Sequence, residues 1–427
     1  PESQFTYTGA SLKVASANDD EETRNESTTV LKRAAENFKN TAENVTNYVI
    51  RIINKATGND NTLNVTLDNV NITAKDDAAL SVEGAGDTKI TLRGSNTLTN
   101  DLLHAGLEHN EKSEDGSYTG KLTITSEKDA DGNDTGSLTA TGGNGAAGIG
   151  SSDGNGAGTI EITGGNITAN GGNNAAGIGS GYNSNGNTTI NIEGGTIVKA
   201  QGGSGRGSSG GAGIGGGDIG SGYTGSSTTN ITISGGTISA AGGSGKSGGD
   251  GIRSGDMLTI KGGEIKQATG GNATGSTGTG GSGIRSNGTL TIKGGEIQQT
   301  AGGDATGKGG TGGSGIRSDS SVKIWGGTIT KATGGSGKSG GDGIGSYGAL
   351  TISGSAKIET AQGGASTNGT GGDGIHSGSV VKISGDTITK ATGGASTDDT
   401  GGDGIRSGSL LTIKGGEIKQ ATGGNAT

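Results

Sequence analysis

The chain has 427 residues, of which 99 are glycine, one is proline, none is cysteine and only 2% are aromatic. This composition excludes a conventional aromatic-rich core, and the near absence of proline and the absence of a Gly-X-Y period exclude collagen. A net charge of −9 gives no reason to expect a nucleic-acid partner, and no apolar run is long enough for membrane insertion. Intrinsic disorder is the alternative, but the few β-branched residues recur at fixed places in a long period, which favours a folded repeat.

The first 46 residues differ from everything that follows. Apolar residues from Val30 to Val45 recur mostly every three or four positions, as is typical of an amphipathic helix. A stacked array of strands exposes an open end that has to be covered. We therefore expect residues 1–46 to form an N-terminal cap with an amphipathic helix. A separate small helical domain is the alternative.

Residues 47–141 change to the periodicity of strands. Short alternating segments at 49–53, 63–67, 70–73, 89–93 and 122–124 are separated by Asn, Asp and Gly. We expect these segments to form irregular first turns of the array that follows them.

Residues 142–427 form a regular glycine-rich array. One unit reads GIRS at 251–254, LTIKGGEI at 258–265 and ATGG at 268–271. Gly-Ile pairs recur every 28 to 38 residues, and each is followed by an apolar-x-Ile strand, a tight turn and a third strand with one isoleucine. The isoleucines of the Gly-Ile pairs are Ile149, Ile178, Ile214, Ile252, Ile284, Ile316, Ile344, Ile375 and Ile405.

Three short strands per period, with no helix between them, describe one turn of a parallel β-helix. The expected fold is all-β: a right-handed parallel β-helix solenoid with three short strands per turn, isoleucine ladders inside and the helical cap at its start. About twelve turns, each ~4.8 Å apart, would give a monomeric rod of roughly 60 Å. Residues 415–427 repeat residues 262–274 letter for letter, so we expect the given array to be truncated.

The order of these motifs resembles the glycine-rich parallel β-helix repeat surface proteins of clostridia and related gut Firmicutes, a carbohydrate-binding domain-containing family. The resemblance covers roughly residues 60–427. It implies a bacterial cell-surface or other extracellular location and a glycan as ligand. Residues 250–427 depart from the family pattern, because most units have Gly-Ile-Arg in place of Gly-Ile-Gly. The residues that carry the resemblance are TLDNVNIT at 66–73, NTLT at 96–99, AGIG at 147–150 and 176–179, and ITGGNI at 162–167.

The residue after the Gly-Ile isoleucine forms the most distinctive row of candidate ligand-binding side chains. It should point outward in every turn because the isoleucine points inward. Aspartates stand three residues earlier in several turns. The row is therefore either a strip for an anionic partner or an Asp–Arg lattice that only stabilises the rod. Its members in successive turns are Arg253, Arg285, Arg317, Gly345, His376 and Arg406.

A second row follows the middle strand of each turn and contains the only tryptophan. Trp325 replaces an outward lysine there and is a candidate for stacking on a sugar or for a protein-binding hot spot. The lysines have a structural alternative, because Lys261 and Lys293 each precede a glutamate by three residues and could pair with it. The candidate binding residues of this row are Lys261, Lys293, Trp325 and Lys414, and Tyr182, Tyr223 and Tyr347 are further candidates in loops.

One acidic segment offers a possible calcium site. Asp129, Asp131 and Asn133 alternate as oxygen ligands in the way that Ca²⁺ requires. Ala140 stands where a calcium loop would carry its bidentate acid, so a plain acidic turn is the alternative. No other cofactor is expected.

The sequence favours a binding protein over an enzyme. Its three histidines are dispersed and no paired carboxylates stand out, so a polysaccharide lyase is an unfavoured alternative. Repetition suits multivalent binding. We expect an extracellular adhesin module that binds host or environmental glycans through its repeated outer face. The alternatives are a module that binds a host secretory protein, such as an immunoglobulin or mucin, and a passive surface stalk.

Overall fold

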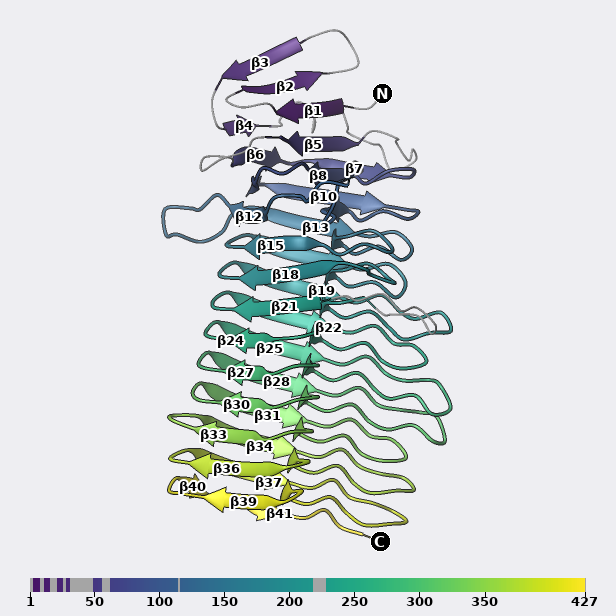
Figure 1. Cartoon of the computed structure of the whole chain (residues 1–427), viewed down its shortest axis with the longest axis vertical. Coiled ribbons are helices and arrows are strands. Elements are labelled where there is room, and N and C mark those ends of the chain that lie inside the picture. Colours follow the sequence, from purple (N-terminus) through teal and green to yellow (C-terminus); the bar gives the residue numbers. More distant parts are fainter. Residues whose placement is uncertain are drawn as a thin grey trace.

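A computed structural model describes residues 49–55, 62–113, 116–217 and 228–426, together with the backbone of four strands between residues 3 and 30. The described chain is a β-solenoid built from three parallel sheets that run side by side along a rod (Figure 1). Each turn contributes one strand to each sheet, and the described part contains no helix. The predicted all-β parallel solenoid with three short strands per turn is confirmed.

The first sheet has 15 strands and contains the Gly-Ile positions. Twelve of its strands, from β5 to β38, pair in parallel, one from each turn. In order they are β3 (Glu21–Asn25), β2 (Ser11–Ala15), β1 (Ser3–Tyr7), β5 (Ile50–Asn54), β8 (Leu80–Glu83), β11 (Leu107–Glu108), β14 (Ile149–Gly150), β17 (Ile178–Gly179), β20 (Ile214–Gly215), β23 (Ile252–Ser254), β26 (Ile284–Ser286), β29 (Ile316–Ser318), β32 (Ile344–Ser346), β35 (Ile375–Ser377) and β38 (Ile405–Ser407).

The second sheet has 13 strands and follows the first after a short corner in each turn. In order they are β4 (Thr28–Val30), β6 (Leu63–Asp68), β9 (Thr88–Arg93), β12 (Leu122–Ser126), β15 (Gly158–Ile162), β18 (Asn187–Ile192), β21 (Thr228–Ile233), β24 (Leu258–Ile260), β27 (Leu290–Ile292), β30 (Val322–Ile324), β33 (Leu350–Ser353), β36 (Val380–Ser384) and β39 (Leu410–Ile413).

The third sheet also has 13 strands: 12 lie along its main path, and β41 (Ala421–Thr422) pairs with β37 beside that path. In order they are β7 (Asn71–Ala74), β10 (Ser95–Asn100), β13 (Ser137–Thr141), β16 (Asn166–Asn170), β19 (Thr196–Gln201), β22 (Thr237–Ala241), β25 (Glu264–Thr269), β28 (Glu296–Ala301), β31 (Thr328–Thr333), β34 (Lys357–Gln362), β37 (Thr387–Thr392) and β40 (Glu417–Ile418).

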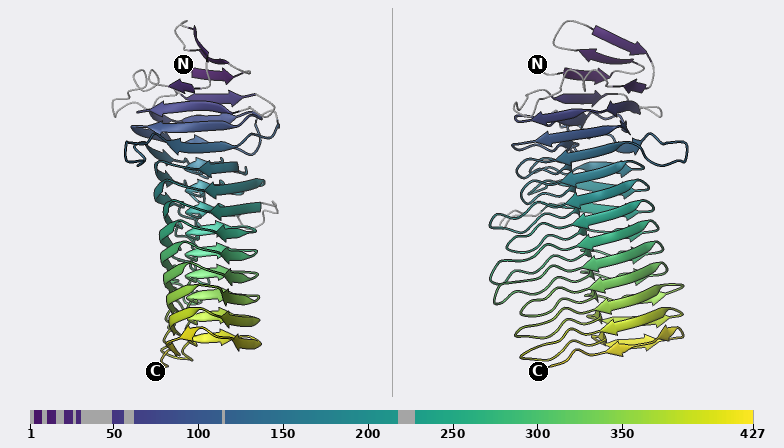
Figure 2. Two further views of the ribbon diagram at one scale, coloured as in Figure 1. Left: turned by 90° about the vertical axis from the view of Figure 1, so that its left-hand side faces the viewer. Right: turned by 180° about the vertical axis from the view of Figure 1, so that it is seen from behind.

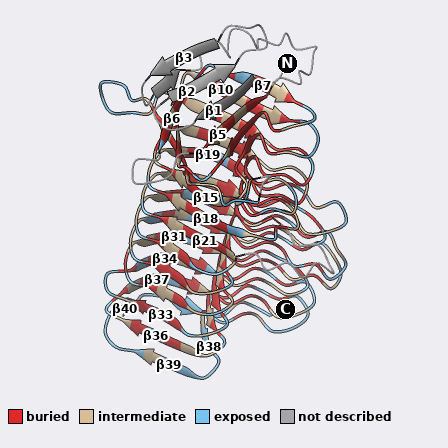
Figure 3. Cartoon of the chain, turned by 45° about the horizontal axis from the view of Figure 1, so that its top comes forward, coloured by how far each residue is buried: buried red, intermediate tan, exposed pale blue. Residues whose placement is uncertain are grey.

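Stacked isoleucines make the core of the rod. In the first sheet Ile284, Ile316 and Ile344 are in register, and each is 0% exposed. The second and third sheets repeat the arrangement, and their buried side chains belong to the same hydrophobic cluster. Figure 3 marks the buried residues along the strands in red. Burying one such side chain contributes about 1.5–3 kcal/mol, and many thin layers replace the large aromatic core that the composition excludes.

Glycine makes the sharp bend between the second and third sheets. The second residue of the Gly-Gly pair has a positive φ, 79° at Gly263 and 84° at Gly295. Side chains with a Cβ rarely adopt this left-handed conformation, which explains why glycine recurs at this corner.

The glycine-rich loops are ordered layers. From β19 onward, after each complete third-sheet strand the chain runs outward through one Gly-Gly pair and returns through a second. Successive loops of this kind stack along one edge of the rod (Figure 2). Gly271 N donates to Gly249 O of the preceding turn at 2.7 Å, and Gly281 N donates back to Gly271 O at 2.9 Å. Gly303 N then donates to Gly281 O at 2.8 Å, which carries the series of bonds into the next turn. We call these paired outgoing and returning glycines the glycine seam.

The glycine seam leaves no room for side chains. An added Cβ would meet Gly313 O at 1.9 Å when placed on Gly302, and Gly271 O at 2.0 Å when placed on Gly303. Both distances are far below a van der Waals contact. Close backbone approach between turns therefore accounts for much of the glycine content, in addition to the bends.

The N-terminal region adds strands to the array. Strand β1 pairs in parallel with β5, and β1, β2 and β3 pair in antiparallel fashion. The expected helix over Val30–Val45 lies outside the described residues, apart from Val30, which ends β4. In the described part of the chain, no helix has the length and apolar character needed to span a membrane.

Candidate binding site

The row that follows the Gly-Ile isoleucines lies on the outer face of the first sheet. Arg253, Arg285 and Arg317 are in register in successive turns, and Gly345, His376 and Arg406 continue the row. Beside the first three arginines the isoleucines are fully buried, whereas those arginines are half-buried; at the end of the row Arg406 is exposed. This arrangement follows from the alternation of a strand.

Carboxylates neutralise the row. Asp319 lies 2.6 Å from Arg285 Nη2 and 3.0 Å from Arg317 Nε, and so bridges two turns. Asp250 lies 3.8 Å from Arg253, and Asp373 lies 3.8 Å from Arg406. Each arginine of the row therefore has an acidic neighbour within 4.0 Å, which favours the lattice interpretation over a free anion-binding strip.

Asp319 gives a direct test of the lattice. Replacing it with asparagine (Asp319→Asn) leaves Arg285 and Arg317 without their carboxylate, which should cost about 2 kcal/mol of local stability at neutral pH. Burial opposes ionisation of Asp319, yet its hydrogen bond from Arg285 and the nearby guanidinium charges lower its pKa. The stabilisation is therefore present above the unfolded pKa of about 4 and is lost as the pH falls through the lower folded value.

Hydrogen exchange of β26 and β29, measured at neutral and acidic pH, checks this expectation. The wild type should be better protected than Asp319→Asn at neutral pH and no better protected in acid. Asp131→Asn, at an exposed position, is the matched control and should behave like the wild type. Equal protection of all three proteins at neutral pH would show that the lattice contributes nothing.

At His376 a histidine takes the place of an arginine beside the carboxylates of the lattice. Its Nδ1 lies 3.1 Å from Asp342 Oδ2 and 3.8 Å from Asp373 Oδ2. The hydrogen bond to Asp342 raises the pKa of His376, and burial raises the pKa of Asp373. Among the residues that the structure describes, these three form the one group of His, Cys, Asp or Glu with metal-ligand spacing.

The second row places Trp325 between lysines. The ring is 44% exposed, and the ammonium groups of Lys293 and Lys323 lie 5.7 and 5.8 Å from its centroid. In the described ranges, neither Lys261 nor Lys293 pairs with the glutamate three residues later. Instead, Glu264 accepts hydrogen bonds from Gln298 and Thr237. Lys414 occupies the same row near the end of the array.

Tyr347 lies at the corner between the first and second sheets and is 61% exposed. Arg317 stacks on its ring at 4.6 Å and also donates a hydrogen bond to its hydroxyl group. Tyr347 and Trp325 therefore provide two exposed aromatic rings near the β30 and β33 turns, each with a cation beside it. Tyr223 lies outside the described residues.

The acidic segment forms a self-contained turn. Asp129 Oδ1 accepts backbone hydrogen bonds from Asp131 at 2.9 Å and from Asn133 at 2.8 Å, and Oδ2 accepts from the Asn133 amide at 3.1 Å. The bonds from Asn133 lower the pKa of Asp129. The carboxylate is engaged within its own turn, which favours the plain acidic turn over the calcium site.

The histidines occupy separate environments. His104 Nδ1 lies 3.0 Å from Glu108 Oε2. His109 is 0% exposed, with Nδ1 2.7 Å from Ala157 O and Nε2 2.9 Å from Gly120 O, and burial lowers its pKa. Neither contributes to the cluster around His376.

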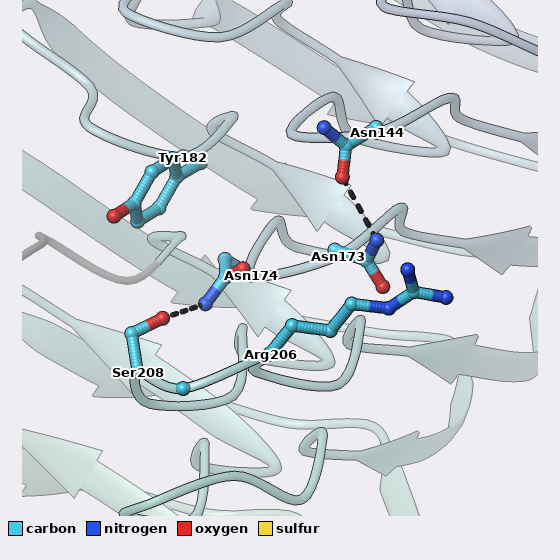
Figure 4. A pocket seen from close by; sticks show the side chains of 7 residues that line it. Asn144, Asn173, Asn174, Tyr182, Arg206 and Ser208 are labelled. Carbon is cyan, nitrogen blue, oxygen red and sulfur yellow. Dashed lines mark hydrogen bonds between the residues drawn. The ribbon is translucent and has the colours of Figure 1, made fainter.

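A cavity that the sequence did not predict lies between the loops that follow β13, β16 and β19 and the β17–β18 loop, which carries Tyr182. It has a volume of about 650 Å³ and opens to solvent (Figure 4). Loops from three successive turns form its wall, so it depends on the stacking of turns. Its lining residues are Asn144, Asn173, Asn174, Tyr182, Arg206, Gly207 and Ser208.

Hydrogen bonds fix the amides that line this cavity. Asn173 Nδ2 donates to Asn144 Oδ1 at 2.8 Å, which ties two turns together. Asn174 adopts a positive φ of 65° and donates to Ser209 O at 2.7 Å and to the Ser208 hydroxyl group. These bonds pre-organise polar groups at the cavity wall without using all of their hydrogen-bonding capacity.

The two ends of the cavity differ in chemistry. In Figure 4 the Tyr182 ring lies on one side, and the Arg206 guanidinium extends toward Asn173 on the other. Arg206 is exposed and has no ion-pair partner among the described residues, unlike the arginines of the first-sheet row. The cavity therefore combines an aromatic ring, several amides and an available cation.

The signal for this cavity in the sequence is small. Gly-Gly-Asn occurs at 142–144 and again at 171–173, so stacked turns bring Asn144 and Asn173 together. Arg206 and Tyr182 stand in loops of different length, and no period relates them.

A scan against protein-family models found none that matches, and searches of curated proteins and of solved structures gave no match either.

Proposed function

We propose that the protein is an extracellular glycan-binding rod, and that the cavity lined by Tyr182, Asn173 and Arg206 binds an acidic sugar. The observation that carries the proposal is the placement of an available guanidinium, fixed amides and an aromatic ring around one open cavity. Its volume of about 650 Å³ falls within the range of small-molecule sites. The resemblance of the repeats to a carbohydrate-binding family is a second, weaker support.

Each group in the cavity matches part of a sugar. The face of an aromatic ring packs against the C–H face of a pyranose, and amides exchange hydrogen bonds with hydroxyl groups. Arg206 would pair with the carboxylate of a uronic acid or with a sulfate, because a guanidinium forms strong charge-assisted bonds with such anions. We therefore assign acidic glycans as the ligand class.

A glycan array tests the proposal, followed by titration calorimetry of the best ligands. The full chain should bind uronic-acid-containing or sulfated glycans, and affinity should fall as salt rises. Arg206→Ser removes a charge-assisted bond and should weaken binding by about tenfold or more. Tyr182→Ala should reduce affinity by a similar factor through the loss of stacking.

Trp325→Ala is the matched control, because it removes an exposed aromatic ring on a different part of the rod. It should leave glycan affinity unchanged. If Arg206→Ser and Tyr182→Ala bind acidic glycans as well as the wild type does, the cavity is not the site. Binding that is lost only in Trp325→Ala would move the site to the second row.

A second candidate function rests on Trp325 and Tyr347. Both rings are exposed and flanked by cations, which is the composition of a protein-binding hot spot. The partner would be an acidic surface of a host secretory protein. An array that includes immunoglobulins and mucins as well as glycans distinguishes the two functions. A protein that binds none of these ligands would favour the passive stalk.

A further inference from the structure

The row of arginines on the first sheet is interrupted at one turn. Gly345 stands in register between Arg317 and His376, so the turn that contains Asp342 contributes no cation to this row. A Cβ at Gly345 would lie 2.8 Å from Asp342 Oδ2. The glycine therefore lets the Asp342 carboxylate lie where a side chain would otherwise stand, and a histidine follows in the next turn where most other turns have arginine.

Backbone hydrogen bonds hold both carboxylates of this cluster in place. Asp342 Oδ1 accepts a bond from the N–H of Asp373 at 2.9 Å, and Asp373 Oδ1 accepts one from the N–H of Asp403 at 2.7 Å. Each aspartate therefore uses one oxygen to link its turn to the next and keeps Oδ2 for the cluster. Such fixed outer contacts orient ligands in metal sites.

Three donor atoms converge as a result. Asp342 Oδ2 lies 3.1 Å from His376 Nδ1, Asp373 Oδ2 lies 3.8 Å from it, and all three atoms lie within 4.8 Å of one another. Ligands of a tetrahedral Zn²⁺ ion, bound at about 2.0–2.2 Å, are roughly 3.3 Å apart. Small side-chain rotations would bring the three atoms to that spacing.

We propose that Asp342, Asp373 and His376 bind one divalent first-row transition-metal ion, with Zn²⁺ as the representative. One imidazole nitrogen and two carboxylate oxygens suit such an ion better than Mg²⁺ or Ca²⁺, which prefer oxygen ligands alone. Three protein ligands leave at least one coordination position of such an ion for water or for an external ligand. The ion links two successive turns, and this site does not depend on the glycan cavity.

Arg406 competes with the ion for Asp373. Its Nη1 lies 3.8 Å from Asp373 Oδ2, but its side chain is 52% exposed and has room to turn toward solvent. The same carboxylate thus has two possible cationic partners. Removing the guanidinium should strengthen metal binding. The test therefore includes one variant with a higher affinity for the ion as well as variants with a lower affinity.

Titration calorimetry of the full chain with Zn²⁺, and the visible absorption of Co²⁺ added in its place, test the proposal. The wild type should bind one equivalent. His376→Gln should weaken binding by about 100-fold or more, and so should Gly345→Arg, which restores the arginine of neighbouring turns. Asp342→Asn keeps the oxygen that accepts the N–H of Asp373 and should also lose the ion, whereas Arg406→Ser should bind it more tightly.

His104→Gln is the matched control, because it removes another partly exposed histidine next to a carboxylate. It should bind Zn²⁺ like the wild type, and circular dichroism should show that every variant keeps its fold. The ion should also slow hydrogen exchange in residues 340–377 of the wild type but not of Asp342→Asn. A wild type that takes up no ion, or variants that bind as the wild type does, would overturn the proposal.

Discussion

Gly303→Ala is expected to disrupt the rod around its own turn and to lower the free energy of unfolding there by about 4 kcal/mol or more. The added methyl group would meet the Gly271 carbonyl oxygen at 2.0 Å. Gly303 also donates to Gly281 O at 2.8 Å and accepts from Gly313 N at 2.9 Å, so the backbone cannot move aside without breaking the seam. Overpacking against a fixed backbone belongs to the most destabilising class of point mutations.

Hydrogen exchange and limited proteolysis measure this effect better than a single melting temperature, because repeat arrays do not always unfold in one step. Protection should fall over residues 270–315. Gly216→Ala is the matched control: its added Cβ would meet nothing nearer than Thr229 Oγ1 at 3.7 Å. If Gly303→Ala is as well protected as Gly216→Ala, the close packing of the glycine seam is refuted.

Ile316→Ala is expected to lower the free energy of unfolding by about 3 kcal/mol. Ile316 is 0% exposed and stacks between Ile284 and Ile344. A narrow solenoid has few other side chains that could fill the resulting cavity, and each turn is supported mainly by its two neighbours. Urea titration followed by tryptophan fluorescence reports the loss, because Trp325 stands in the same turn.

Val198→Ala is the matched control, because it also shortens an aliphatic β-strand residue but at a position that is 53% exposed. Its stability should lie within about 0.5 kcal/mol of the wild type. Equal urea midpoints for Ile316→Ala and the wild type would show that the stacked isoleucines are not the source of the rod's stability.

The architecture of the array could be predicted because its signal is carried by single residues. Ile252, Ile284 and Ile316 recur one per turn beside strands that alternate, and only stacked parallel turns bury all of them. The glycine seam could not be predicted in the same way. Glycines such as Gly271 recur with the unit, but their spacing does not show which backbone atoms they contact, and their role depends on contacts between turns.

The contacts in the candidate sites also differ in how far the sequence predicts them. Asp250 and Arg253 stand three residues apart, so their pairing could be anticipated from the sequence. Asp319 bridges Arg285 and Arg317 across turns, and this contact depends on how the corners stack. The cavity could not be predicted, because Asn144, Asn173 and Arg206 belong to three different loops. The sequence does not show how these loops stack along the rod.

The two proposed sites use the repeat in different ways. In the cavity, loop length varies between turns and creates a hollow with an available guanidinium. At Gly345 and His376, two successive turns depart from the row of arginines and leave two carboxylates beside a histidine. In both places the regular turns supply rigid spacing, and a local departure from the repeat supplies the chemistry, as functional sites on scaffolds often do.

A crystal structure of the full chain with the best acidic oligosaccharide from the array would show where the ligand binds. We expect the sugar's carboxylate or sulfate to lie within hydrogen-bonding distance of Arg206, with a sugar ring against Tyr182 and hydroxyl groups on Asn144 or Asn173. Oligosaccharide bound instead along the arginine row or at Trp325, with none in the cavity, would contradict this expectation.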